Sequence, residues 1–141
     1  MISFTFPLRL VSEANRASSQ HWRVRAKRAK QQKHVTHWAA WAAAPEYRDR
    51  FGRDPNAPAL IVTMVRIAPC ALDSDNVVGA CKYVRDALAQ LLGIDDGDPR
   101  IDWRVEQRKG APKQYAVEIR IETRIQDHNV SRGCAEGVEN S

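Results

Sequence analysis

The sequence predicts one α+β domain, with a small mixed, mainly antiparallel sheet of about four strands and two main helices. Three observations predict this class. Apolar residues recur at every second position in several short runs, they recur at helical spacing in one longer segment, and the period changes cleanly between segments. With 141 residues, of which 43% are hydrophobic, the chain has the size and apolar content of one domain.

Residues 2–10 form the first predicted strand. Their apolar side chains fall on alternate positions, which is the period of a strand with one buried face. These side chains are Phe4, Phe6, Leu8 and Leu10.

The first helix is predicted to extend from Ser18 or Ser19, which can cap its start, to about Ala44. This segment is rich in Ala, Lys, Arg and Gln, which favour helix, and Pro45 stops it. Residues 47–58 contain glycine, proline and asparagine among charged residues, so we expect an exposed loop there.

Residues 60–67, LIVTMVRI, predict a central strand that is covered on both faces, because nearly every side chain is apolar or β-branched. The second helix is predicted over 76–92, where apolar residues recur at steps of four and three and form one stripe. Gly93 supplies the helix stop. The stripe consists of Val77, Cys81, Val84, Leu88 and Leu91.

Alternation predicts two further strands, at 101–105 and 115–121. The link between them contains Lys-Gly-Ala-Pro-Lys, so we expect the two strands to form an antiparallel hairpin. The domain is expected to occupy residues 1–123. Residues 124–141 show little periodicity and are expected to form a flexible C-terminal tail.

The charge balance favours an anionic partner. The net charge is +5 and the pI is about 9.4, which suits nucleic acid or a membrane surface. No stretch approaches the roughly 20 apolar residues needed to cross a bilayer, and the first residues lack the pattern of a signal peptide. We therefore expect a cytoplasmic protein without a membrane partner. Cys70, Cys81 and Cys134 are odd in number and widely separated, as expected of reduced thiols.

Two groups of aspartates carry the functional signal. Asp73 and Asp75 are two residues apart after the central strand, so in extended backbone their carboxylates project on the same side. Asp95, Asp96 and Asp98 follow the second helix. Carboxylate oxygens suit Mg²⁺, with Mn²⁺ as the alternative ion, and a bound cation can generate the hydroxide for phosphodiester hydrolysis. The alternative is structural, with Asp75 as a helix cap and Asp-Gly-Asp-Pro as a turn.

The order of these motifs resembles the core of the RusA family of Holliday junction resolvases. The matching features are Leu-Asp-Ser-Asp-Asn, a helix with lysine and Arg-Asp-Ala-Leu, and Gly-Ile-Asp-Asp before a strand, all within residues 60–122. The resemblance implies that Asp73, Asp75 and Asp96 bind a divalent metal, with Asp95 as an acidic neighbour. It also implies an α+β homodimer that cuts four-way DNA junctions in recombination and repair, of a kind often carried by phages.

The lysine of the chain departs from the family pattern. The family lysine falls four residues after the second aspartate, where this chain has Gly79, whereas Lys82 lies seven residues after it. Asp75, Gly79, Lys82 and Asp86 still share one side of a helix, so Lys82 is the candidate catalytic cation. Two alternatives are a surface pair between Lys82 and Asp86, and a DNA-binding module that has lost catalysis.

Six cations without an intervening acid lie in the first predicted helix, a block that would follow a phosphate backbone. They are Arg23, Arg25, Lys27, Arg28, Lys30 and Lys33. The alternatives are a solvated helix face and a surface that docks an acidic protein partner.

Three tryptophans share the same predicted helix. We expect Trp22, Trp38 and Trp41 to belong to the core, because large aromatic residues at helical spacing usually do, with base stacking by an exposed Trp22 as the alternative. His34 and His37 are assigned no chemistry.

Overall fold

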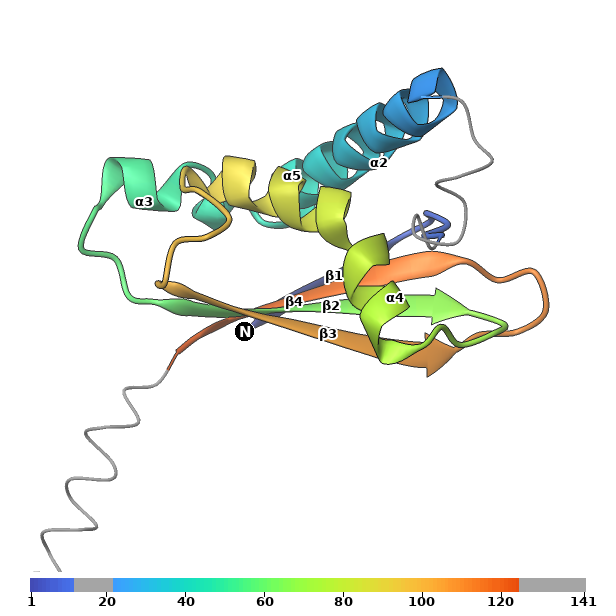
Figure 1. The fold of residues 1–141 in the computed structure, drawn as a ribbon. Helices are drawn as coiled ribbons and strands as arrows, with labels where there is room; N and C mark the ends of the chain where they lie inside the picture. Colours follow the sequence, from blue (N-terminus) through green and yellow to red (C-terminus); the bar gives the residue numbers. More distant parts are fainter. Residues whose placement is uncertain (12–21, 125–141) are drawn as a thin grey trace, which may run out of the picture.

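The computed structural model describes residues 1–11 and 22–124, so the predicted caps Ser18 and Ser19 and almost all of the predicted tail lie outside the described residues. Helices α2 and α5 cover one face of a four-stranded sheet (Figure 1), which confirms the α+β class. The elements are β1 (Ile2–Phe6), α2 (Trp22–Ala43), a 3-10 helix η1 (Pro45–Tyr47), α3 (Arg50–Arg53), β2 (Leu60–Ala68), α4 (Ser74–Ala80), α5 (Lys82–Leu92), β3 (Ile101–Lys109) and β4 (Ala116–Thr123).

The sheet has the strand order β1-β4-β2-β3. β2 lies between β3, which is parallel to it, and β4, which is antiparallel. The predicted hairpin of 101–105 with 115–121 is therefore wrong, because β2 separates the two strands. Alternation identifies the buried face of a strand but not its neighbour, and the helical crossover α4–α5 brings β3 back parallel to β2. β4 then pairs with the other edge of β2 and with β1.

The buried stripe of α2 consists of small and polar residues rather than tryptophans. Gln32, Thr36 and Ala40 recur every four positions on the side that packs against the rest of the protein. Trp38 and Trp41 lie on other sides of the helix and are 54% and 39% exposed. The predicted core positions of the tryptophans are therefore wrong. The alanine and threonine of the buried stripe allow α2 to approach α5 closely, which leaves no room for an aromatic ring there.

The exposed aromatic residues instead contact one another. The rings of Trp38 and Trp41 lie 6.2 Å apart, and His37 lies 5.5 Å from Trp38 and 5.6 Å from Trp41. Arg48 lies 4.0 Å from the Trp41 ring centre. Trp22 is 61% exposed, as the stacking alternative requires.

The segment expected to be an exposed loop contains the short helix α3, and its first residue, Tyr47, ends η1. Tyr47 and Phe51 are buried, and the Asp49 N–H donates to the carbonyl of Leu91 over 2.6 Å. The segment is thus fixed to the end of α5. Gly93 ends that helix as predicted, with a φ of 80° that favours glycine.

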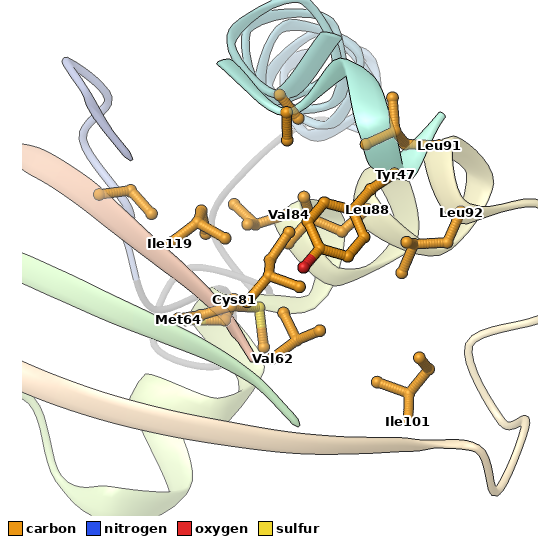
Figure 2. Close-up of a cluster of buried hydrophobic side chains, with 14 of the residues drawn as sticks. Tyr47, Val62, Met64, Cys81, Val84, Leu88, Leu91, Leu92, Ile101 and Ile119 are labelled. Atoms are coloured by element: carbon orange, nitrogen blue, oxygen red, sulfur yellow. The ribbon is translucent and has the colours of Figure 1, made fainter. Parts of the chain in front are cut away.

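The second predicted helix is divided into α4 and α5 at Cys81, whose φ and ψ are −89° and 2°. The stripe predicted along this segment is nevertheless buried throughout. The bend at Cys81 lets both helices contribute to one core. Figure 2 shows Val84 and Leu88 of α5 facing Val62 and Met64 of β2, all members of one hydrophobic cluster.

On the second face of the sheet, the described residues form a set of ion pairs and no helix. Arg120 contacts Glu118 at 2.9 Å and Glu106 at 3.3 Å, and Arg108 contacts Glu118 at 2.8 Å. Val65 of β2 lies opposite Glu106 and Glu118 in the ladders and is only 1% exposed. The prediction that β2 is buried on both faces is confirmed, and the stems of charged side chains supply this cover.

Candidate functional site

The loop after β2 presents the first pair of aspartates. Asp73 occupies the cap position of α4 without a side-chain capping hydrogen bond, and Asp75 lies in the first turn. Both are exposed. The structural alternative, in which Asp75 caps the helix, is therefore wrong. Because neither carboxylate is buried, both are accessible to a cation.

A side-chain clamp fixes this loop to β3. The side-chain amide of Gln107 donates to the carbonyl of Leu72 over 2.7 Å, and the N–H of Leu72 donates to Gln107 Oε1 over 2.8 Å. Arg66 donates to the same Oε1 over 3.2 Å and to the carbonyl of Cys70 over 2.8 Å. Leu72, the residue before Asp73, is thus held by a side-chain amide that makes two hydrogen bonds of the kind a neighbouring strand would make.

Arg66 brings a positive charge into the interior beside the loop. It is only 7% exposed, and its hydrogen bonds reach uncharged oxygens of Leu10, Cys70 and Gln107. Burial lowers the pKa of Arg66. Among the described residues, the hydrogen-bond acceptors of this guanidinium are all neutral, which favours an anion near this end of the sheet.

The second group of aspartates lies in the turn after α5, where each one has a different environment. Asp98 contacts Arg100 at 2.7 Å, and these hydrogen bonds lower the pKa of Asp98 to about 2. Asp96 contacts Arg85 at 3.3 Å, and its carbonyl accepts a hydrogen bond from Trp103 Nε1 over 3.0 Å. Asp95 is exposed. Asp98 is thus paired with Arg100 within the turn, whereas Asp96 faces Arg85 of α5.

Asp86 joins Asp96 in a carboxyl pair that sequence analysis did not predict. Burial raises the pKa of Asp86, and so do a hydrogen bond with Asp96 and the repulsion between the two carboxyl groups. Lys33, at 4.0 Å, and Lys82 act in the opposite direction. Lys82 therefore attracts the Asp86 carboxylate, as the surface-pair alternative proposed, but Lys33 is the cation that contacts Asp86.

The two acidic groups lie apart along β3. Leu72 is bound to Gln107 and Asp96 to Trp103, four residues away on the same strand, which corresponds to about 13 Å at about 3.3 Å per residue. Figure 1 shows the same separation, with the start of α4 and the turn after α5 at opposite ends of the helical crossover. Within residues 1–11 and 22–124, no three His, Cys, Asp or Glu side chains form a metal-binding group. The expected meeting of Asp73, Asp75 and Asp96 is thus not seen within one chain.

A groove of about 420 Å³ lies beside β3, between the helical crossover and the sheet. Its walls include Gly79, Lys82, Arg85 and Trp103. An added Cβ at Gly79 would meet nothing within 4 Å, so the surface beside Lys82 is open. Lys82 is exposed and Arg85 is partly buried. Two cations thus line a groove that has carboxylates toward each end.

The predicted basic block lies on α2, but its cations do not share one side. At 100° per residue, the six positions are distributed around the helix. Lys33 turns toward Asp86 and contacts the Tyr83 ring at 5.7 Å, whereas Lys27 and Lys30 are exposed. A DNA backbone on one side of α2 would therefore meet only part of the block.

Sequence analysis assigned no functional role to three residues of this region. Arg66 had a signal, since a charge within LIVTMVRI is unusual in a buried strand. Asp86 had a weaker one, as an acid in the Arg-Asp-Ala-Leu run, and Gln107 had none.

No family model matches this chain, and no curated protein matches it significantly. Among the described helices, none is long and apolar enough to span a membrane. Functional inference therefore depends on the residues and their arrangement.

Proposed function

We propose that this protein is a Mg²⁺-dependent endodeoxyribonuclease that resolves Holliday junctions or other branched DNA in the cytoplasm, as the resemblance to the RusA family implies. One observation carries the proposal: the groove beside β3 has two cations, Lys82 and Arg85, on its wall and carboxylates toward each end. Carboxylates that hold a metal next to cations that hold a phosphate are the combination that phosphodiester hydrolysis needs.

The donor set fits a hard divalent cation. Asp73 and Asp75 offer exposed carboxylates two residues apart, and Asp86 and Asp96 are close enough to share a hydrogen bond, hence close enough to share one ion. Mg²⁺ usually binds one or two carboxylates and completes its shell with water and substrate phosphate. A pair at either end therefore suffices without a third ligand, and Mn²⁺ fits the same oxygens.

Each residue of the site would have a separate role in the reaction. Asp73 and Asp75 would hold the catalytic ion, which supplies the hydroxide nucleophile and neutralises charge when bound. Lys82 would stabilise the charge that develops on the scissile phosphate, and Arg85 would hold that phosphate in place. The clamp of Gln107 on Leu72 would keep the Asp73 backbone fixed during the reaction.

DNA binding outside the groove would depend on α2. Its exposed cations, such as Lys27 and Lys30, would contact phosphates that flank the cut and supply affinity without sequence preference. A homodimer would present two grooves, so that the two opposing strands of a junction are cut symmetrically. We propose this dimer because the resemblance to the RusA family implies it.

The decisive experiment is cleavage of a synthetic four-way junction, with a linear duplex of equal length as the substrate control and EDTA as the metal control. Asp73→Asn and Asp75→Asn should abolish cleavage and leave junction binding intact or tighter, because repulsion of phosphate falls. Asp102→Asn is a matched control, since Asp102 pairs with Arg104 on the open face of the sheet. Full cleavage by both site variants would contradict the proposal.

The second candidate function is a DNA-binding module without catalysis, favoured by Gly79 at the position of the family lysine. Both candidates bind junctions, but only the nuclease cuts when Mg²⁺ is added. Gly79→Lys has space for its side chain and removes a poor helix former. If wild type is inactive and Gly79→Lys cuts, the binding module is the correct reading of the natural chain.

A further inference from the structure

A second pocket lies beside the opposite edge of the sheet from the groove. It has a volume of about 390 Å³ and is enclosed by α2, the residues after β1 and the residues before β4. β1 and β4 occupy the far side of the sheet from β3. The pocket is therefore separate from the proposed nuclease groove.

The walls of this pocket are cationic. Arg9, Arg28 and Lys113 line it, and its lining in the described part of the chain includes no acidic residue. The guanidinium of Arg9 lies 4.4 Å from the centre of the Tyr115 ring, which fixes the orientation of Arg9. Arg66 adds to the positive potential from the interior, since the charge of Arg9 is one of the influences that lower the pKa of Arg66.

The pocket also contains a buried amide without a partner. Gln32 lines the pocket and is only 1% exposed, and neither its amide nitrogen nor its amide oxygen has a hydrogen-bond partner among residues 1–11 and 22–124. One turn further along α2, the buried hydroxyl of Thr36 also has no hydrogen-bond partner in the described part of the chain. Buried side-chain polar groups are nearly always paired, so the Gln32 amide, which lines the pocket, is the group that a polar ligand would complete.

The rim of the pocket carries a lysine in a costly conformation. Lys113 has a φ of 63°, in the left-handed region that glycine and asparagine adopt more readily. A turn selected for stability alone would favour one of those residues. The lysine keeps a positive charge where a neutral side chain would fit the backbone better.

We infer that this pocket binds the phosphate group of a nucleotide. Arg9 and Lys113 hold the phosphate oxygens, and the amide of Gln32 bonds a polar group of the bound unit. The volume exceeds that of a phosphate ion alone, and Leu8 and Val35 give the wall an apolar part against which a sugar or base packs. The phosphate belongs either to a free mononucleotide or to a nucleic-acid strand. This binding needs no metal and does not depend on the proposed nuclease function.

Calorimetric titration in EDTA tests the inference with three probes: inorganic phosphate, dTMP and a short single-stranded oligonucleotide. Wild type should bind dTMP, and Arg9→Gln and Lys113→Asn should each weaken this binding by about tenfold or more, since each removes a charge-assisted hydrogen bond. Arg104→Gln is the matched control, because it removes one exposed charge on the open face of the sheet, outside the pocket. It should bind dTMP as wild type does. Oligonucleotide binding that is tighter than dTMP binding and is weakened by Arg9→Gln and Lys113→Asn identifies a strand as the source. Tighter binding of dTMP identifies the free nucleotide.

Thermal melting separates ligand binding from a structural role. Lys113→Asn should keep or raise the melting temperature, because asparagine tolerates the left-handed conformation. Gln32→Leu should raise the melting temperature by removing a buried unpaired amide, and should weaken dTMP binding. Absence of binding to all three probes, or equal affinity for dTMP in wild type, Arg9→Gln and Lys113→Asn, would overturn the inference.

Discussion

Replacement of Gln107 by leucine tests whether the clamp holds the loop that presents Asp73. The variant keeps the volume of the side chain but removes its two hydrogen bonds with Leu72 and the one from Arg66. Each hydrogen bond contributes about 0.5–1.5 kcal/mol net, and loss of an acceptor for a buried guanidinium costs more, so we expect a loss of about 3 kcal/mol in the free energy of unfolding. For a domain of this size that is a fall of about 10 °C in melting temperature.

Thermal and urea unfolding followed by far-ultraviolet circular dichroism would measure this loss. Gln114→Leu is the matched control, because Gln114 accepts one hydrogen bond, from the Ala111 N–H over 2.7 Å, in an exposed turn. The control should lose less than about 1 kcal/mol. If Gln107→Leu is no less stable than Gln114→Leu, the loop is not held by the amide, and the reasoning that connects Gln107 to the aspartates is refuted.

Three further predictions concern single groups. Lys82→Ala should slow junction cleavage at saturating Mg²⁺ by about 10²-fold and leave the melting temperature nearly unchanged, whereas an unchanged rate would remove Lys82 from the reaction. In the folded protein, iodoacetamide at pH 8 should modify exposed Cys70 but not Cys81, whose pKa burial raises to about 12, and peptide mass mapping would show any equal labelling. The pKa of Asp98 is lowered to about 2 by Arg100, so its contribution to stability is present above its ordinary pKa of 3.8 and is lost as the pH falls toward 2. The difference in melting temperature between wild type and Asp98→Asn should therefore shrink between about pH 4 and pH 2, and a constant difference would contradict the pairing.

The periods of the sequence predicted the strands and the long helix but not how the strands pair. Alternation in β3 and β4 reports one buried face in each, and this signal is the same whether a strand pairs with its neighbour in sequence or with β2. The pairing depends on the path of the α4–α5 crossover. The local sequence of a hairpin link does not contain that information.

The tryptophans show a second limit of prediction from the sequence pattern. Trp38 and Trp41 are large and apolar, but the buried side of α2 is decided by the elements against which it packs, chiefly α5, and the residues buried there include Thr36 and Ala40. Helical spacing defines stripes on a helix. Only packing decides which stripe is inside.

For the candidate site, the sequence predicted where one of the two acidic groups lies in the fold. Asp73 and Asp75 could be located after a strand from sequence alone, and both are exposed there as a metal site requires. The contact of Asp96 with Asp86 could not be predicted from the sequence, because an acid such as Asp86 on an amphipathic helix has the pattern of a solvent-facing residue. The Asp86–Asp96 contact joins a helix to the turn that follows it, and it depends on how Gly93 directs the chain.

The pairing of β1 with β4 also has a consequence for synthesis on the ribosome. β1 is made first, but its partner is complete only when residue 123 has left the exit tunnel. Until then β2 lacks its antiparallel neighbour, and the edge that β4 will cover remains free to pair with another nascent chain. The nascent chain is therefore most exposed to misassembly after β2 has emerged and before β4 has, and slow elongation before β4 would lengthen that interval.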